Sequence, residues 1–173
     1  AHAAVMPVIR ELLCDFADAL WRKKCEKDAI GFDDGEQVAL SLLGEWTPDG
    51  VVRTPLAAEL SDFYQMLLLD EFQDTNNRQD MIFKLLSHGG SATQNGDNLF
   101  MVGDVKQSIY RFRLANPRIF LDTMDASVPY SDDTSGKNAY LRLRRNFRSS
   151  PEVVQLVNFV FGALMSPAVG EVC

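Results

Sequence analysis

Three carboxylates, Asp70, Glu71 and Asp74, follow directly after the apolar run Met66–Leu69. A short, continuous apolar run of this kind predicts a strand that is buried on both faces. In open α/β sheets, ligands bind just beyond the carboxyl ends of the strands. Carboxylates in that position can hold Mg²⁺ and take a proton from water, so we expect chemistry on a phosphate there. The alternative is an ordinary strand that ends in a solvated acidic turn.

A helix and a second strand follow the acidic cluster. Apolar residues on one face predict a helix over residues 77–87. A second short apolar strand is predicted over residues 98–102, and it too ends in a polar turn, Gly103-Asp104. Two strands separated by a helix of this length form a βαβ-like unit and favour parallel pairing, so the predicted fold class is α/β.

The rest of the chain is predicted to be mainly helical. Apolar residues at helical spacing predict an amphipathic helix over residues 5–28. We expect further helices over residues 35–43 and 55–64, one from about residue 107 that is interrupted near Pro117, and a last one that begins at Pro151 with Ser150 as N-cap. The Pro-Asp-Gly signal in residues 47–54 predicts a loop, and residues 140–143 predict a third strand.

The composition is that of an ordinary globular protein, with 46% hydrophobic and 24% charged residues. No apolar run approaches the roughly 20 residues of a membrane helix, and the N-terminus lacks the features of a secretory signal. Three widely spaced cysteines, Cys14, Cys25 and Cys173, favour a reducing compartment over a disulfide framework or a zinc site.

The charge is unevenly distributed along the chain. The net charge of -7 argues against a protein that binds nucleic acid by bulk electrostatics. Basic residues nevertheless gather in two short windows, residues 104–118 and 137–150. Such windows are either solvated surface or binding patches, and charge alone does not decide between the two.

Three stretches of sequence carry a resemblance to a known family. They are Asp70–Thr75 (DEFQDT), Gly103–Arg113 (GDVKQSIYRFR) and Asn146–Ser149 (NFRS). Together, in this order, they resemble motifs II, III and IV of the UvrD/Rep-like superfamily 1 DNA helicases. Within that family, residues 102–117 are most similar to the AddA-type helicase/nuclease branch. The resemblance implies a P-loop NTPase-like (RecA-like) motor domain of the α/β class, with a parallel sheet flanked by helices.

The resemblance implies an ATP site with four residues. Asp70 would bind Mg²⁺ on the β- and γ-phosphates of ATP through water, and Glu71, also close to the metal, would orient and deprotonate the attacking water. Gln107 would reach the γ-phosphate as a sensor, and Arg148 would point a permanently charged planar group at it from the second motor domain. For Gln107 the alternative is a residue that caps a helix.

The resemblance also implies a group that binds DNA. Phe112 and Tyr110 lie two residues apart and are interleaved with Arg111 and Arg113. Aromatic faces stack on bases of any sequence, and basic neighbours hold the phosphate chain. In the family, the position of Phe112 stacks on single-stranded DNA, whereas the position of Tyr110 is more often part of a supporting pocket. Core packing is the alternative for both aromatic residues.

One element of the family is missing from the sequence. No GxxxxGK[ST] loop occurs among the 173 residues. Without it the phosphates lose a cradle of backbone N–H groups and its lysine, so we expect the isolated chain to be inactive. We interpret the chain as an internal piece of a larger protein: the C-terminal part of a first RecA-like motor domain (1–127), a linker (128–138) and the start of a second motor domain (139–173).

The resemblance implies an ATP-dependent DNA helicase that couples ATP hydrolysis to translocation on single-stranded DNA and to unwinding of duplex DNA. The AddA-type branch implies a helicase/exonuclease subunit in bacterial double-strand-break repair, with ATP and Mg²⁺ as cofactors, an AddB-type partner subunit, no membrane, and a cytoplasmic, nucleoid-associated location. Three alternatives stay open: a UvrD-like helicase without a nuclease, a non-catalytic DNA- or protein-binding module on the same scaffold, and a metal-dependent nuclease that uses Asp70, Glu71 and Asp74 directly.

Overall fold

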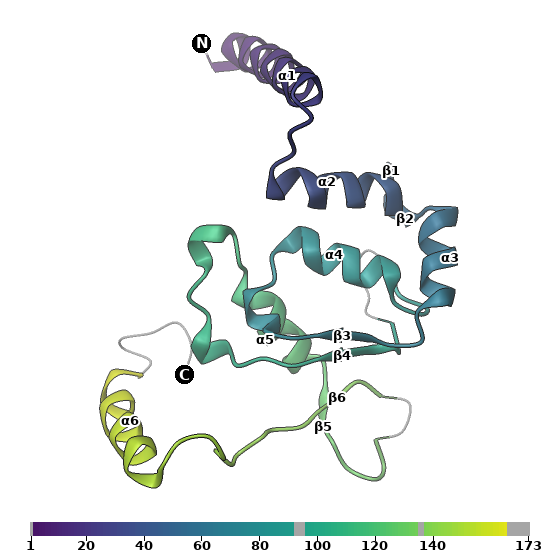
Figure 1. Cartoon of the computed structure of the whole chain (residues 1–173). Coiled ribbons are helices and arrows are strands. Elements are labelled where there is room, and N and C mark those ends of the chain that lie inside the picture. Colours follow the sequence, from purple (N-terminus) through teal and green to yellow (C-terminus); the bar gives the residue numbers. More distant parts are fainter. Residues whose placement is uncertain (1, 92–95, 135–136, 166–173) are drawn as a thin grey trace. The chain divides into compact units, whose positions relative to one another are not determined.

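The computed structural model describes residues 2–91, 96–134 and 137–165 of the chain (Figure 1). The chain divides into two units, Ala1–Ser41 and Leu42–Cys173. Helices and short strands alternate along it, and strands pair in parallel in two places. The prediction of a mixed α/β chain is therefore confirmed.

The first unit contains α1 (His2–Glu26) and most of α2 (Phe32–Leu43). An ion pair of 2.7 Å between the Lys24 ammonium and the Asp34 carboxylate joins the two helices. The Asp34 carboxylate also accepts a hydrogen bond of 2.6 Å from the Gly31 N–H. A carboxylate that reaches back to an N–H at the start of a helix closes its first turn, so α2 begins at Phe32 and not at the predicted Gly35. Hydrogen bonds from Lys24 and from Gly31 hold the pKa of Asp34 below its ordinary value.

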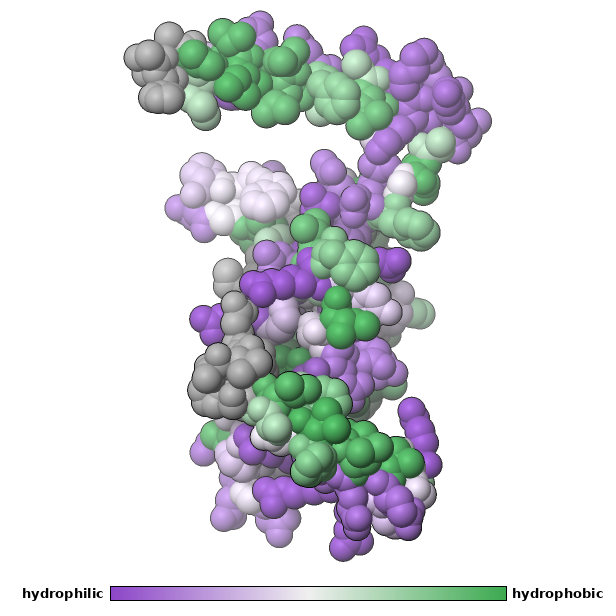
Figure 2. Space-filling view, turned by 90° about the vertical axis from the view of Figure 1, so that its left-hand side faces the viewer, coloured by the Kyte–Doolittle hydropathy of each residue, from purple (hydrophilic) through white to green (hydrophobic). Residues whose placement is uncertain are grey.

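The apolar side chains of α1 follow one another along the helix, as the amphipathic pattern predicts. Figure 2 shows them as a green surface along the length of the helix. They are exposed, and they include the large side chains of Leu12, Phe16 and Trp21. The described residues therefore leave the apolar face of α1 uncovered.

The second unit opens with an antiparallel hairpin of β1 (Gly44–Thr47) and β2 (Gly50–Arg53). The prediction of a loop over residues 47–54 was right about the turn and wrong about the residues that follow it. Gly50 has a φ of +127°, which only glycine adopts readily, and this lets the chain reverse directly into β2. The Thr47 hydroxyl donates to the Gly50 carbonyl at 2.7 Å and closes the turn.

Helices α3 (Pro55–Phe63) and α4 (Asn77–Leu86) pack on each other and hold part of a small core. The Thr54 hydroxyl caps α3, and Asn76 forms a capping box with Gln79 at the start of α4. Between the helices, the Ser61 hydroxyl donates to the Ser87 carbonyl at 3.1 Å. The fully buried apolar residues of the described chain are few: Leu43, Ala57, Phe72, Leu85 and Ala115.

Strands β3 (Leu67–Leu69) and β4 (Leu99–Met101) pair in parallel, as predicted, with Leu68 opposite Phe100 (Figure 1). Side chains alternate between the two faces of a strand. Leu67 and Leu69 are half-buried, whereas Leu68 is 68% and Phe100 59% exposed. The prediction of burial on both faces was therefore wrong for the described chain, because only one face of this two-stranded sheet is covered.

The segment after β4 consists of 3₁₀ turns and a late helix. Turn η2 (Val105–Gln107) and turn η3 (Arg111–Arg113) precede α5 (Pro117–Asp125). A helix from residue 107 was predicted wrongly. Leu114 adopts a left-handed conformation with a φ of 67° and ends η3. Asn116 then caps α5 by accepting from the Arg118 N–H, so Pro117 begins this helix and does not interrupt one.

The C-terminal part of the described chain contains β5 (Val128–Pro129), β6 (Ala139–Tyr140) and α6 (Pro151–Leu164). The predicted strand at residues 140–143 reaches only Tyr140, because the backbone beyond it makes no further ladder and Leu141 and Leu143 are exposed. Helix α6 begins at Pro151, as predicted. Residues 135–136 of the predicted linker and residues 166–173, which include Cys173, lie outside the described residues.

Across the described ranges, no helix combines the length and the apolar character that crossing a membrane requires.

Candidate functional site

The predicted acidic pair lies at the carboxyl end of β3. Asp70 follows the strand directly and is exposed, and its Oδ1 accepts a hydrogen bond of 2.9 Å from the Glu71 N–H. Glu71 adopts a left-handed backbone conformation, with φ 49° and ψ 41°. That conformation is uncommon for a residue with a side chain. It turns the chain sharply into η1 (Phe72–Asp74), whose Phe72 N–H bonds the Val102 carbonyl at 2.9 Å.

Gln73 connects the acidic pair to the end of the neighbouring strand. Its side chain is buried, with 1% of the residue exposed. Its Nε2 donates to Glu71 Oε2 at 2.7 Å, and its Oε1 accepts from the Asp104 N–H at 2.9 Å. Sequence reasoning did not select Gln73, although it lies inside the DEFQDT stretch. An amide two residues after a catalytic acid is a signal that could have marked it.

The turn after β4 is held by the carboxylate of Asp104. This carboxylate accepts from the Lys106 ammonium at 2.7 Å, from the Lys106 N–H at 3.1 Å and from Gln107 Nε2 at 3.1 Å. Burial raises the pKa of Asp104, but the hydrogen bonds from Lys106 and Gln107 outweigh burial and hold this pKa below its ordinary value. Gln107 is exposed at the end of η2, so its amide is near the surface where a ligand could reach it.

The three predicted residues Asp70, Glu71 and Gln107 thus lie on two turns that follow adjacent parallel strands. Hydrogen bonds run from Glu71 through Gln73 and Asp104 to Gln107. This is the edge at which ligands bind in open α/β sheets.

Asp74, the third carboxylate of the cluster, faces away from open water. Its Oδ2 lies 3.5 Å from Gln73 Nε2. Its Oδ1 is buried and has no hydrogen-bond partner within the described chain. Asp74 is therefore placed as a supporting group behind the acidic pair, a less favourable place for a direct metal ligand.

Gly103 lies where the two turns approach each other most closely. A Cβ atom at this position would meet Gln73 Oε1, with the Phe120 ring and the Phe72 nitrogen each at 3.1 Å. Phe72 and Phe120 also contact each other, with ring centroids 6.1 Å apart. Only glycine fits between these groups without displacing the Gln73 amide.

The predicted DNA-binding residues form a cluster around η3. The rings of Tyr110 and Phe112 are 5.9 Å apart, and the Arg113 guanidinium lies over both of them, at 5.6 and 5.7 Å. Phe112 is 76% exposed and Tyr110 39% exposed. Core packing, the alternative for both residues, does not occur in the described chain. Arg111 and Arg113 are exposed as well.

Arg148 is not brought to the acidic pair. It is exposed and lies in a turn in which the Asn146 side chain accepts from the Arg148 and Ser149 N–H groups, at 2.9 and 3.0 Å. Within the described residues, its side chain makes no hydrogen bond or ion pair with Asp70, Glu71 or Gln107. Its predicted role therefore stays a prediction.

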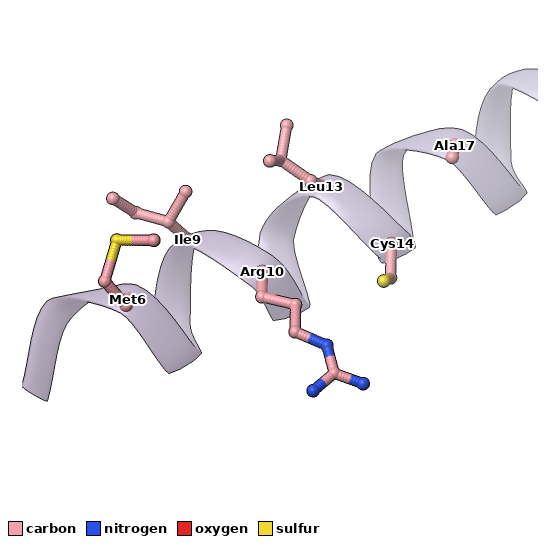
Figure 3. Close-up of a pocket in the computed structure, with 6 residues that line it drawn as sticks. All are labelled: Met6, Ile9, Arg10, Leu13, Cys14 and Ala17. Atoms are coloured by element: carbon pink, nitrogen blue, oxygen red, sulfur yellow. The ribbon is translucent and has the colours of Figure 1, made fainter. Parts of the chain in front are cut away.

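The described residues offer no ready-made metal centre or deep cavity near these turns. They contain no group of three or more His, Cys, Asp or Glu side chains that could hold a metal ion. A hollow is present on α1 (Figure 3), lined by Met6, Ile9, Arg10, Leu13, Cys14 and Ala17. All six side chains come from one helix, and no acid, base or metal-ligand pair is among them, so we assign no chemistry to this hollow.

Comparison with known proteins agrees with the resemblance seen in the motifs. Residues 8–127 match the family described as UvrD/REP helicase N-terminal domain. The chain is 41% identical over 164 residues to the AddA subunit of the ATP-dependent helicase/nuclease of Clostridium botulinum, which covers 94% of the chain and 13% of that relative. It is 44% identical over 169 residues to the protein of the same description from Pelotomaculum thermopropionicum, covering 95% of the chain and 13% of the relative. For the Bacillus pumilus protein the identity is 40% over 174 residues, covering 98% and 14%. The chain thus spans about an eighth of the length of these relatives.

Proposed function

The chain belongs to the UvrD/REP helicase family, and from that premise we propose that it forms part of an ATP-dependent DNA helicase motor of the AddA type. The observation that carries the proposal is the meeting of Asp70, Glu71 and the turn bearing Gln107 at the carboxyl ends of β3 and β4. The relatives described as AddA subunits of an ATP-dependent helicase/nuclease support the choice of branch.

The motor is proposed to be RecA-like, as membership of the family implies. Residues 1–127 would belong to the first motor domain, 128–138 to a linker and 139–173 to the second motor domain. The end of the family match at residue 127 supports the first boundary. The open face at Leu68 and Phe100 supports a larger sheet, because apolar strand faces are normally covered in such folds.

The proposed reaction is hydrolysis of the terminal phosphoanhydride bond of ATP. The oxygen of a water molecule forms a bond to the γ-phosphorus, and the bond from that phosphorus to the β–γ bridging oxygen breaks and leaves ADP. Glu71 takes a proton from the attacking water. Its carboxylate suits this role because Gln73 fixes its orientation from the buried side.

The donor set at the end of β3 fits a magnesium ion that arrives with the nucleotide. Mg²⁺ usually binds one or two protein carboxylates and fills its other positions with phosphate oxygens and water. The exposed Asp70 carboxylate offers such a ligand, with Glu71 beside it. When bound, Mg²⁺ would neutralise charge on the β- and γ-phosphates.

Gln107 and Arg148 are proposed to face the γ-phosphate. Gln107 has a neutral amide that can donate to a phosphate oxygen, and its present bond to Asp104 is exposed enough to be exchanged for one. Arg148 would supply a permanent charge from the second motor domain, which requires a movement that brings the two domains together.

DNA would bind at the cluster formed by Tyr110, Arg111, Phe112 and Arg113. The exposed ring of Phe112 offers a face for stacking on a base of single-stranded DNA, and Tyr110 would support it. Together with ATP hydrolysis, this would move the protein along one strand and separate duplex DNA.

The complete protein is proposed to be a bacterial, cytoplasmic, nucleoid-associated helicase/exonuclease subunit that acts with an AddB-type partner in double-strand-break repair. The word nuclease in the description of the relatives favours this reading over a UvrD-like helicase without a nuclease.

The test uses the complete helicase that contains this segment. Glu71→Gln should abolish DNA-stimulated ATP hydrolysis, with a loss of about 10²-fold or more, and should leave ATP binding intact because the amide keeps the size of the side chain. Phosphate release and binding of a slowly hydrolysed ATP analogue are the measurements. A variant that hydrolyses ATP normally would reject the proposed site.

A further inference from the structure

A buried amide joins the two turns of the proposed catalytic site. Both ends of the Gln73 side chain are engaged, since Nε2 donates to Glu71 Oε2 at 2.7 Å and Oε1 accepts from the Asp104 N–H at 2.9 Å. The second contact fixes the orientation of the amide, because a backbone N–H only donates and must face the amide oxygen. The NH₂ end is therefore turned toward the Glu71 carboxylate.

The packing around Gln73 leaves the amide no second position. Gln73 is 1% exposed, and a Cβ at Gly103 would already collide with its Oε1. The Ser108 hydroxyl lies 3.4 Å from the Gln73 carbonyl and ties its backbone to the same turn. A side chain held at both ends in this way transmits a shift of one turn to the other.

We propose that Gln73 is a positioning residue for ATP hydrolysis: it orients the Glu71 carboxylate toward the attacking water and couples that orientation to the turn that carries Gln107. This inference rests on the proposed function, in which Glu71 is the base and Gln107 faces the γ-phosphate. A neutral amide suits the task. A carboxylate in its place would repel Glu71, and an apolar side chain would leave the buried Asp104 N–H without its acceptor.

Two substitutions in the complete helicase test this role. Gln73→Met keeps the length of the side chain and removes both hydrogen bonds. Because a base displaced by about 1 Å costs about 10²-fold in rate, we expect kcat for DNA-stimulated ATP hydrolysis to fall by about 10- to 100-fold. KM for ATP should change by less than about threefold, since no contact to the nucleotide is removed. Gln73→Asn keeps an amide but is one methylene too short to reach both partners, so its kcat should lie between those of Gln73→Met and the wild type.

Ser61→Ala provides a matched control. Ser61 is also buried, with 2% exposed, and its hydroxyl donates to the Ser87 carbonyl in the packing of α3 against α4. Removing this bond should lower the melting temperature as much as Gln73→Met does and leave kcat unchanged. A split between kcat and stability of this kind is not expected of a residue that merely supports the fold.

The opposite results are equally clear. A folded Gln73→Met enzyme with kcat within about twofold of the wild type would overturn the inference, as would an equal fall of kcat in Ser61→Ala. If Gln73→Met does not fold, Gln73→Asn decides by the same criteria. Failure of both to fold, with Ser61→Ala folded, would make Gln73 a residue of the fold and reject positioning. A wild-type helicase without DNA-stimulated hydrolysis would instead reject the proposed function itself.

Discussion

At the scale of single residues, Glu71 combines an unfavourable backbone with a tightly held side chain. Its φ of 49° lies in the left-handed region, where the Cβ of an ordinary residue is crowded. The carboxylate is nevertheless fixed by Gln73 at 2.7 Å. Backbone strain of this kind gathers at functional sites. The strain therefore supports the role of Glu71 as the base, and it also makes a prediction that does not depend on activity.

We predict that Glu71→Gly is more stable than Glu71→Ala by about 1 kcal/mol, because only the alanine keeps a crowded Cβ in the left-handed conformation. Chemical unfolding of the two variants measures the difference. Glu59 is the control, since it is exposed inside helix α3, where Gly should be less stable than Ala by about 1 kcal/mol. The same order of stability at both positions would show that Glu71 is not strained.

For Phe112→Ala in the complete helicase, we predict weaker binding of single-stranded DNA, by about 1 to 3 kcal/mol, with basal ATP hydrolysis largely kept. The reason is that 76% of Phe112 is exposed and its loss removes a stacking face and no core contact. Fluorescence titration with an oligonucleotide and phosphate release without DNA are the measurements. An equal loss of both activities would instead indicate a packing role.

Sequence reasoning identified Asp70, Glu71 and Gln107 because a family resemblance depends on residue types and their order. Gln73 stood in the same stretch and was passed over. Its role follows from two facts that no local pattern contains, namely the register that sets Leu69 opposite Met101 and the burial of the amide between the turns that follow.

At the scale of elements, the strands and their parallel pairing were predictable, and the covering of their faces was not. An apolar run reports how a strand is buried in its final surroundings, whereas Leu68 and Phe100 are open in the described chain. The helix predicted from residue 107 failed for a local reason. The Asp104 carboxylate binds the Lys106 N–H and favours a 3₁₀ turn, and a left-handed Leu114 then stops the coil.

The turn η2 should carry a pH dependence through Asp104. The folded pKa of this group lies below its ordinary value of 3.8, so its carboxylate stabilises the fold fully above about pH 4 and loses that effect as the pH falls through the folded value. We predict that the melting temperatures of wild type and Asp104→Ala differ by a constant amount from about pH 5 to 8 and converge below about pH 4. Thermal unfolding over this range is the measurement. A difference that widens in acid would contradict the assignment.

At the scale of the whole molecule, much of the apolar surface of the described chain has no covering. The faces of α1 and of the β3–β4 pair are both exposed. The chain spans about an eighth of the length of its relatives, and it contains no GxxxxGK[ST] loop. The acidic wall of an ATP site is present in this sequence, and the loop that cradles phosphates is not.

We therefore predict that the 173-residue chain by itself neither hydrolyses ATP nor unwinds DNA. Phosphate release with and without single-stranded DNA measures the first activity, and strand separation of a labelled duplex measures the second. Turnover that is stimulated by DNA and lost on Glu71→Gln would falsify this prediction, because it would show that the residues present suffice for catalysis.

The tight fit at Gly103 has a consequence for genetics. An added methyl group there would push the Gln73 amide off the Asp104 N–H without touching any residue that is proposed to meet the nucleotide. In a screen for repair-deficient strains, alleles at Gly103 and Gln73 should therefore fall into one phenotypic class. Combining them in one gene should add little to either allele alone, since both break the same link.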